Sequence, residues 1–302
     1  MYPDEFDYYR ADSVDEALSL LEEHDDAEFI AGGHSLLPTM KSGLATPDAL
    51  VDIGSIPGID GIDVDGDTVT VGALMTYAEL LEADIGTALP AFVEAAGEIG
   101  DVQVRNAGTV GGNLAHADPA SDLPAAALAA DATIHAAGPD GERTVPVDEF
   151  FIAPYATALG EHELLTRVEL PVVEAGAGAY AKKASPSSGY AMVGVAVRLA
   201  AAGGVVDDAR VAATGAVDHA MRLGTVEDAL EGVSLGADAG GIAADAAEGV
   251  TDGVEPWQLM DDLQASAEFR EQLLEVYAGR AIERALDDAA PGGGESERPT
   301  AA

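Results

Sequence analysis

Two glycine-centred segments constrain this chain more than any other feature of its sequence. The first is Ala31-Gly32-Gly33-His34-Ser35-Leu36-Leu37-Pro38, and the second runs from Thr109 through Gly111-Gly112 to Pro119. Each combines a Gly-Gly step with small or hydroxylated side chains and is bounded by a proline. Because glycine has no Cβ, such a step lets the backbone approach a ligand closely and turn its N–H groups towards an anion. The sequence therefore predicts two ligand-binding loops.

The chemistry of these loops indicates a dinucleotide such as FAD, whose pyrophosphate they would hold from both sides. Side chains of Ser35, Thr109 and Asn113 can donate to phosphate oxygens or ribityl hydroxyls, and backbone N–H groups would supply most of the positive potential. Neither loop has the GxGxxG spacing of a Rossmann fingerprint. His34 and His116 lie inside the loops, where they are either part of the loop structure or contacts for the phosphates or the flavin ring.

The net charge limits the classes of partner. The chain has 55 acidic against 14 basic residues, a net charge of -41, which argues against binding to nucleic acid or to an anionic membrane surface. The acidic residues are spread through amphipathic segments and are not massed in a tail. This distribution favours a surface adapted to high salt over an acidic regulatory protein.

The absence of cysteine excludes disulfides, thiolate nucleophiles, iron–sulfur ligation and a cysteinyl–flavin bond in this chain. Its histidines show no HxxxH or HxH spacing, so no metal site is expected. The first residues, Met1-Tyr2-Pro3-Asp4-Glu5, are not typical of a signal peptide, and no apolar window has the length of a membrane span. We therefore expect a cytoplasmic chain without a transmembrane segment.

Local patterns predict a mixed α+β chain in two units that divide near residue 173. Ser13-Val14-Asp15-Glu16 is typical of a capping box at the start of a helix over 13–23. Alternation across 62–71 predicts a hairpin that turns at Asp65-Gly66, and the run 171–179 predicts a linker. Thr76-Tyr77-Ala78-Glu79 is expected to cap a further helix, and other helices are expected over 90–99, from 122, and over 225–230, 240–248 and 266–286. Further strands are expected over 28–30, 49–53, 132–137, 143–147, 191–200 and 205–214.

Four residues near or beyond the loops have a structural interpretation beside a functional one. Asp122 precedes Leu123-Pro124 as a helix N-cap does, or it holds ligand hydroxyls. Arg105 lies just before the second loop, where a salt bridge is its favoured role. Lys182 and Tyr190 are a surface lysine and a core tyrosine, or they stabilise the N1–C2=O edge of a reduced flavin and stack on its ring.

In the two glycine segments and the residues around them, the chain resembles the FAD-binding medium subunits of the molybdenum hydroxylases, the family of the aerobic carbon monoxide dehydrogenase medium chain. The family motif AGGxSLxPxM is matched at 31–40, and RNxGTxGG(S/N)xAHADPxxDxP is matched at 105–124. The similarity extends from the N-terminal segment to the last predicted helix, up to about residue 286. One departure is Gly189, because the family residue before the aromatic that matches Tyr190 is usually Asp or Arg.

The resemblance implies a PCMH-type, vanillyl-alcohol-oxidase-like FAD-binding domain of two α/β subdomains over 1–173. A small α+β C-terminal domain over 177–286 would follow. The low-complexity composition from Pro291 onward predicts a disordered tail over 287–302. Both Gly-Gly loops would hold the FAD pyrophosphate, and we predict no catalytic residue and no metal ligand in this chain. The predicted cofactor-binding residues are Ala31, Gly32, Gly33, His34, Ser35, Leu36, Thr109, Val110, Gly111, Gly112, Asn113, Asp122, Lys182 and Tyr190.

The function that the resemblance implies is electron transfer within a molybdenum hydroxylase complex. FAD on this chain would receive electrons from iron–sulfur clusters on a partner and pass them to an external acceptor. The expected partners are a molybdopterin-binding large subunit and a [2Fe–2S] small subunit in a dimer of heterotrimers. Two alternatives stay open, a stand-alone FAD-dependent oxidase or dehydrogenase and a cofactor-free acidic interaction protein.

Overall fold

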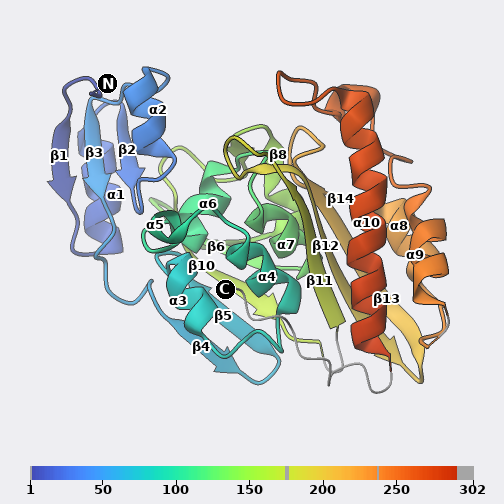
Figure 1. Cartoon of the computed structure of the whole chain (residues 1–302). Helices are drawn as coiled ribbons and strands as arrows, with labels where there is room; N and C mark the ends of the chain where they lie inside the picture. The colour runs from blue at the N-terminus through green and yellow to red at the C-terminus, as the bar shows by residue number, and fades with distance from the viewer. Residues whose placement is uncertain (1, 174–176, 237, 291–302) are drawn as a thin grey trace.

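The computed structural model describes residues 2–173, 177–236 and 238–290 of the chain. Two larger sheets, a two-stranded one and their helices form an N-terminal unit, and a four-stranded sheet with its helices forms a C-terminal unit beside it (Figure 1). In Figure 1 the three-stranded sheet stands on the left, and the last helix runs along the C-terminal sheet on the right. This is the mixed α and β architecture that the sequence predicts.

The first sheet has three parallel strands in the order β1-β3-β2. Ser13 caps the first helix by accepting from the Glu16 N–H, as expected, but the Glu16 carboxylate accepts from the Asp12 N–H. The capping box predicts that the Glu16 carboxylate accepts from the Ser13 N–H, but its partner is the Asp12 N–H, one residue earlier. The elements are β1 (Asp7–Arg10), α1 (Val14–Glu23), β2 (Ala27–Ile30), α2 (Leu36–Ser42) and β3 (Ala49–Asp52).

The second sheet has five antiparallel strands in the order β4-β5-β10-β6-β7, and β10 returns late in the chain to its centre. The hairpin at Asp65-Gly66 is confirmed, with Gly66 at φ 58°. The strands are β4 (Ile62–Asp65), β5 (Thr68–Gly72), β6 (Thr133–Gly138), β7 (Gly141–Pro146) and β10 (Leu164–Pro171). A 3-10 turn, η1 (Val147–Glu149), leads into a small hairpin of β8 (Phe151–Ala153) and β9 (Ala156–Thr157).

Helices pack on the second sheet and close its core. The predicted capping box of Thr76 and Glu79 is present at the first of them. The second Gly-Gly step lies inside a helix and not in a loop, because Thr109 caps α6 by accepting from the Gly112 N–H. The helices are α3 (Tyr77–Glu82), α4 (Pro90–Gly97), α5 (Val102–Arg105), α6 (Val110–His116) and α7 (Leu123–Ala129).

The C-terminal unit is a four-stranded antiparallel sheet covered by helices. The predicted linker over 171–179 is wrong at its end, since β11 begins at Ala177 and is buried there. The last helix passes the predicted end at Leu286, and the tail residues 291–302 lie outside the described residues. The elements are β11 (Ala177–Ala184), β12 (Ala191–Ala202), β13 (Val205–Thr214), β14 (Met221–Arg222), α8 (Gly224–Leu230), α9 (Ala239–Ala247), η2 (Pro256–Gln258) and α10 (Ala267–Ala289).

Helix α7 joins the two units. Every residue from Leu123 to Ala129 is buried, and the helix packs against β12 and β13 of the C-terminal sheet. Its alanines allow this close approach because their side chains end at Cβ. Polar bonds cross the same seam, including the Arg284 guanidinium on Glu94 at 2.8 Å. The two units therefore pack closely against each other along α7.

Candidate functional site

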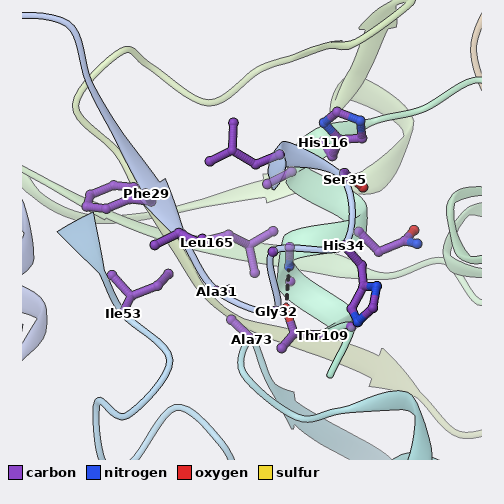
Figure 2. A pocket seen from close by; sticks show the side chains of 18 of the residues that line it. Phe29, Ala31, Gly32, His34, Ser35, Ile53, Ala73, Thr109, His116 and Leu165 are labelled. Atoms are coloured by element: carbon purple, nitrogen blue, oxygen red, sulfur yellow. Dashed lines mark hydrogen bonds between the residues drawn. The ribbon is translucent and has the colours of Figure 1, made fainter. Parts of the chain in front are cut away.

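A cavity of about 420 Å³ lies between the two glycine segments (Figure 2). The first segment leaves β2 at Ile30 and enters α2 at Leu36, and the second is the first turn of α6. Apolar side chains from both N-terminal sheets complete the wall, among them Phe29, Ile53 and Leu165. The predicted residues that line the cavity are Ala31, Gly32, Gly33, His34, Ser35, Leu36, Thr109, Gly111, Gly112 and Asn113.

Two of the glycines make room for the protein itself. A Cβ on Gly32 would stand 2.0 Å from the Ala107 carbonyl oxygen, and one on Gly111 would stand 2.5 Å from the Ala73 Cβ. Gly32 therefore lets the first segment approach the residues just before the second, and Gly111 lets the second segment approach the residue that follows β5. This differs from our expectation that each Gly-Gly step makes room for a ligand. Gly33 has another constraint, because its φ of +68° is a left-handed conformation that favours glycine.

The second segment uses its own backbone N–H groups inside the protein. This corrects the expectation that both segments offer N–H groups to an anion, because helix formation and contact with the residues that follow β5 use these donors. Val110 itself is fully buried in the core and does not line the cavity. The bonds run from Val110 N to Met75 O (2.9 Å), from Gly111 N to Ala73 O (2.8 Å) and from Gly112 N to Thr109 Oγ1 (3.2 Å).

The first segment is different. Among the described residues, the backbone N–H groups from Gly32 to Leu36 donate to no protein acceptor, and all of these residues line the cavity. The left-handed Gly33 is followed by Ser35 in a right-handed conformation, with φ -102° and ψ -54°. Successive N–H groups in such a turn form a concave site for an anion. The positive potential of the cavity is therefore concentrated in the first segment.

The two histidines have different surroundings. His34 is exposed and lines the cavity. The His116 ring packs edge-on against Tyr155, with 5.3 Å between ring centroids. Burial lowers the pKa of His116, and the Asp118 carboxylate opposes this shift. His116 is thus part of the packing around Tyr155, a residue that the sequence did not single out and whose φ is +57°.

Asn113 lines the cavity, but its side chain is held by neighbours. Its Nδ2 donates to the Tyr77 hydroxyl at 2.8 Å, and its Oδ1 accepts from the Ser121 hydroxyl at 2.7 Å. Tyr77 also lines the cavity, and burial raises the pKa of its hydroxyl. The sequence placed Tyr77 in a capped helix but gave no signal that its hydroxyl reaches the α6 segment.

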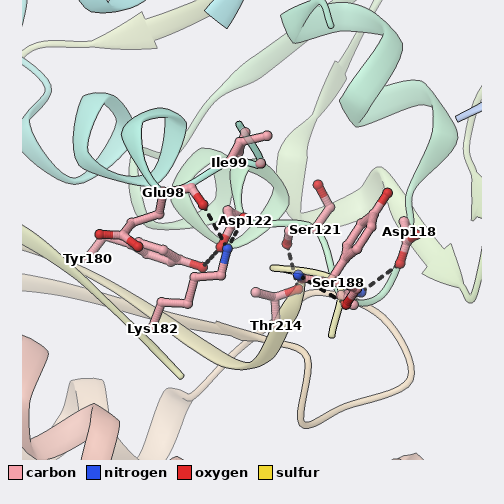
Figure 3. Close-up of polar contacts among 12 residues, drawn as sticks. Glu98, Ile99, Asp118, Ser121, Asp122, Tyr180, Lys182, Ser188 and Thr214 are labelled. Carbon is pink, nitrogen blue, oxygen red and sulfur yellow. Dashed lines mark hydrogen bonds and ion pairs between the residues drawn. The ribbon is translucent and has the colours of Figure 1, made fainter. Parts of the chain in front are cut away.

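Asp122 and Lys182 contact each other at the seam between the units (Figure 3). Lys182 Nζ lies 2.8 Å from Asp122 Oδ2 and 2.9 Å from the Glu98 carbonyl oxygen, and the Tyr180 hydroxyl donates to Asp122 Oδ1 at 2.5 Å. The Lys182 and Asp122 side chains are 2% and 4% exposed. Burial raises the pKa of Asp122 to about 6, against the opposing effects of Lys182 and Tyr180.

This pairing changes the interpretation of three predicted residues. Asp122 stands at the N-cap position of α7, but its side chain makes no capping bond and is directed to Lys182. Asp122, Lys182 and Tyr190 do not line the cavity, and Tyr190 is 43% exposed in the turn before β12. Arg105 makes no predicted salt bridge among the described residues, and instead donates to the carbonyls of Ile99 and Gly100.

The described residues include neither a metal-binding cluster nor a membrane-spanning helix. No group of three histidine or acidic side chains in this part of the chain has the geometry of a metal site. No helix within 2–173, 177–236 or 238–290 is both long and apolar enough to cross a membrane.

Comparison with known families gives two matches that cover most of the chain. Residues 4–173 match the FAD binding domain in molybdopterin dehydrogenase, and residues 178–285 match the CO dehydrogenase flavoprotein C-terminal domain. The N-terminal match contains the whole cavity, and the C-terminal match contains Lys182 and Tyr190.

Individual relatives are similar along almost their full length. The carbon monoxide dehydrogenase medium chain of Hydrogenophaga pseudoflava is 38% identical over 292 residues, which cover 96% of this chain and 98% of that one. The glyceraldehyde dehydrogenase medium chain of Sulfolobus acidocaldarius is 34% identical over 93% of this chain and 99% of its own. A solved carbon monoxide dehydrogenase chain from Hydrogenophaga pseudoflava superposes with a TM-score of 0.89 at 36% identity, over 96% of this chain and all of that one.

Proposed function

The chain belongs to the FAD-binding medium subunits of the molybdenum hydroxylases, and from this premise we propose that it transfers electrons within a multi-subunit complex. FAD is its cofactor, and it is an oxidoreductase subunit. We propose that the cofactor occupies the cavity between the glycine segments. Electrons would arrive from iron–sulfur clusters on a partner and leave to an external acceptor.

The observation that carries the proposal is the run of backbone N–H groups from Gly32 to Leu36, which line the cavity and have no acceptor in the part of the chain that the structure describes. A dinucleotide brings a doubly charged pyrophosphate, which accepts from such donors without a cationic side chain. The Ser35 and Thr109 hydroxyls lie on the same wall and add donors. The residues present thus fit FAD.

The apolar wall fits the aromatic parts of the same cofactor. Phe29, Ile53 and Leu165 line the cavity beyond the loop, and their surfaces suit an aromatic ring more than a phosphate. When bound, FAD supplies the redox chemistry, and the protein supplies binding, orientation and the electrostatic surroundings. For Asp122 and Lys182 we propose a role in holding the units together, because their charged atoms are paired with each other.

The chain needs partners for this function. It has no cysteine, so iron–sulfur clusters must come from another polypeptide. We propose a molybdopterin-binding large subunit and a [2Fe–2S] small subunit, assembled as a dimer of heterotrimers. Large apolar side chains that a partner would cover support this, among them Ile152, Tyr155 and Trp257, each at least 60% exposed.

The test is the chain purified alone in high salt and incubated with FAD. After gel filtration, we expect about one flavin per chain by visible absorbance and no oxidation of carbon monoxide, purines or aldehydes. A protein that takes up FAD and oxidises one of these substrates unaided would favour the stand-alone oxidase. A protein that rejects FAD would refute the proposal.

A further inference from the structure

The segment Pro119–Ser121 connects the second glycine segment to Asp122, and the C-terminal unit binds all of it. The Ala191 N–H donates to Ala120 O at 3.0 Å, and the Gly215 N–H donates to Pro119 O at 2.7 Å. Thr214, the last residue of β13, also contacts this segment and donates to Ser121 O at 2.8 Å (Figure 3). Three consecutive carbonyl groups of the N-terminal unit therefore find donors in the other unit.

Thr214 is the side chain in this contact. It is completely buried, and its Oγ1 lies 2.7 Å from the Pro119 carbonyl oxygen and 2.8 Å from the Ser121 carbonyl oxygen. One hydroxyl proton is shared between the two acceptors. Pro119 has a second donor in Gly215, whereas within the described residues the Ser121 carbonyl accepts from Thr214 alone.

The contact continues to the cavity through side chains. The Ser121 hydroxyl donates to Asn113 Oδ1 at 2.7 Å, and Asn113 Nδ2 donates to the Tyr77 hydroxyl at 2.8 Å. Both Asn113 and Tyr77 line the cavity, and Asn113 belongs to α6. The position of the Ser121 backbone therefore sets where its hydroxyl meets the Asn113 amide.

We propose that Thr214 is a positioning residue of the FAD site, although it belongs to the other unit and does not line the cavity. The proposal rests on the proposed function, which places FAD in that cavity. Without the Thr214 hydroxyl, the Ser121 carbonyl is buried without a donor, and the segment must shift to satisfy it. The shift moves the Ser121 hydroxyl and releases the Asn113 amide and the Tyr77 hydroxyl from their fixed orientation.

The test compares two substitutions at one position by titration of the apo-chain with FAD, followed by flavin fluorescence. Thr214→Val keeps the shape and removes the hydroxyl, and we expect the FAD dissociation constant to rise about tenfold. Thr214→Ser keeps the hydroxyl, and we expect a change of less than about twofold. This rescue separates the hydroxyl bond from the packing of the methyl group.

The control is Thr225→Val. Thr225 Oγ1 also donates to two carbonyl oxygens, those of Gly249 and Asp252, but at a distance from the segment and the cavity. We expect FAD affinity equal to that of the wild-type chain. Melting temperatures of the apo-variants measure the loss of stability separately from the loss of binding.

A double-mutant cycle tests whether the effect of Thr214 reaches the cavity through Ser121 and Asn113. Ser121→Ala removes the hydroxyl that reaches Asn113 and leaves the bond from Thr214 to the Ser121 carbonyl in place. We expect about tenfold weaker FAD binding in Ser121→Ala, and less than about twofold further loss when Thr214→Val is added. Because Ser121→Ala and Thr214→Ser keep the interdomain bond, they report on the route even where Thr214→Val does not fold.

The outcomes are distinct. Wild-type affinity in folded Thr214→Val or in Ser121→Ala, or equal losses in Thr214→Val and Thr214→Ser, would overturn the positioning role and leave the proposed function intact. If the increases in the FAD dissociation constant of the two single variants multiply in full in the double variant, the route through Ser121 is overturned. Failure of the wild-type chain to bind FAD would overturn the proposed function and the positioning role together.

Discussion

Replacement of Lys182 by methionine tests the ion pair that joins the two units. Methionine has a similar length and no charge, so the variant removes the bonds of Nζ to Asp122 and Glu98 with little change in packing. The Asp122 carboxylate then keeps the Tyr180 hydroxyl as its side-chain donor. Because both charged side chains are at most 4% exposed, we expect the free energy of unfolding to fall by about 3–5 kcal/mol at neutral to alkaline pH.

The same variant has a pH dependence whose sign follows from Asp122. Burial already raises its pKa to about 6, and Lys182 opposes that rise, so the variant's Asp122 pKa is higher still. When the folded-state pKa of a carboxyl group lies above its unfolded value of about 3.9, the free energy of unfolding of the protein falls as the pH rises from the unfolded pKa to the folded pKa. The cost of Lys182→Met is therefore larger at about pH 8 than at about pH 6, where Asp122 is largely protonated in the variant.

The assay is urea unfolding followed by circular dichroism, at both pH values and at one fixed salt concentration. The matched control is Lys183→Met, the next residue of β11, for which the described residues provide no carboxylate partner within salt-bridge distance. A loss below about 1 kcal/mol at about pH 8, the range of a surface ion pair, would refute the buried pair as a stabilising contact. A larger loss at the lower pH would refute the assigned sign.

Three further predictions concern the cofactor, the surface and the complex. Gly33→Val forces a β-branched residue to φ +68°, and we expect it to abolish FAD uptake measured by absorbance. The control Gly43→Val also has a positive φ, +74°, but it has open space and lies outside the cavity, so it should keep FAD uptake. Equal FAD occupancy in both variants would contradict the loop assignment. With a net charge of -41, the melting temperature should rise steeply with KCl as the Debye length falls to about 3 Å near 1 M, and a flat curve would contradict adaptation to salt. Purification from the native host should recover a molybdenum-containing chain and a cysteine-rich chain with this one; recovery of a free monomer alone would contradict the proposed partners.

The sequence predicted most secondary structure because its signals are local. Ser13 and Thr76 cap helices, Asp65-Gly66 turns a hairpin, and each depends on residues within one turn of the chain. The errors occurred where tertiary contacts decide. The residues from Ala177 have a linker-like composition and become a strand because β12 and α10 bury them.

The sequence predicted which residues line the cavity, but it did not predict which side chains and backbone groups bind each other around it. The motifs identified ten residues that line the cavity, because glycine and hydroxylated side chains mark a loop that approaches phosphate. They did not show that Asp122 and Lys182, 60 residues apart, would take each other as partners. Nor did they show which segment keeps free N–H groups, since this depends on the approach of α6 to Ala73 and Met75.

The choice of donors at the cavity follows from the charge of the whole chain. Basic residues are few, and no lysine or arginine is among the described residues that line the cavity. Lys182 binds Asp122 and Glu98, and Arg105 binds the carbonyls of Ile99 and Gly100. A cationic side chain placed beside the anion would also be surrounded by acidic groups that compete for it. Backbone N–H groups avoid this competition, since their partial charges are fixed by the fold and act at hydrogen-bond distance, where salt screens little. Among the described residues the N–H groups from Gly32 to Leu36 have no protein acceptor, and they thus give an acidic protein donors for an anionic ligand.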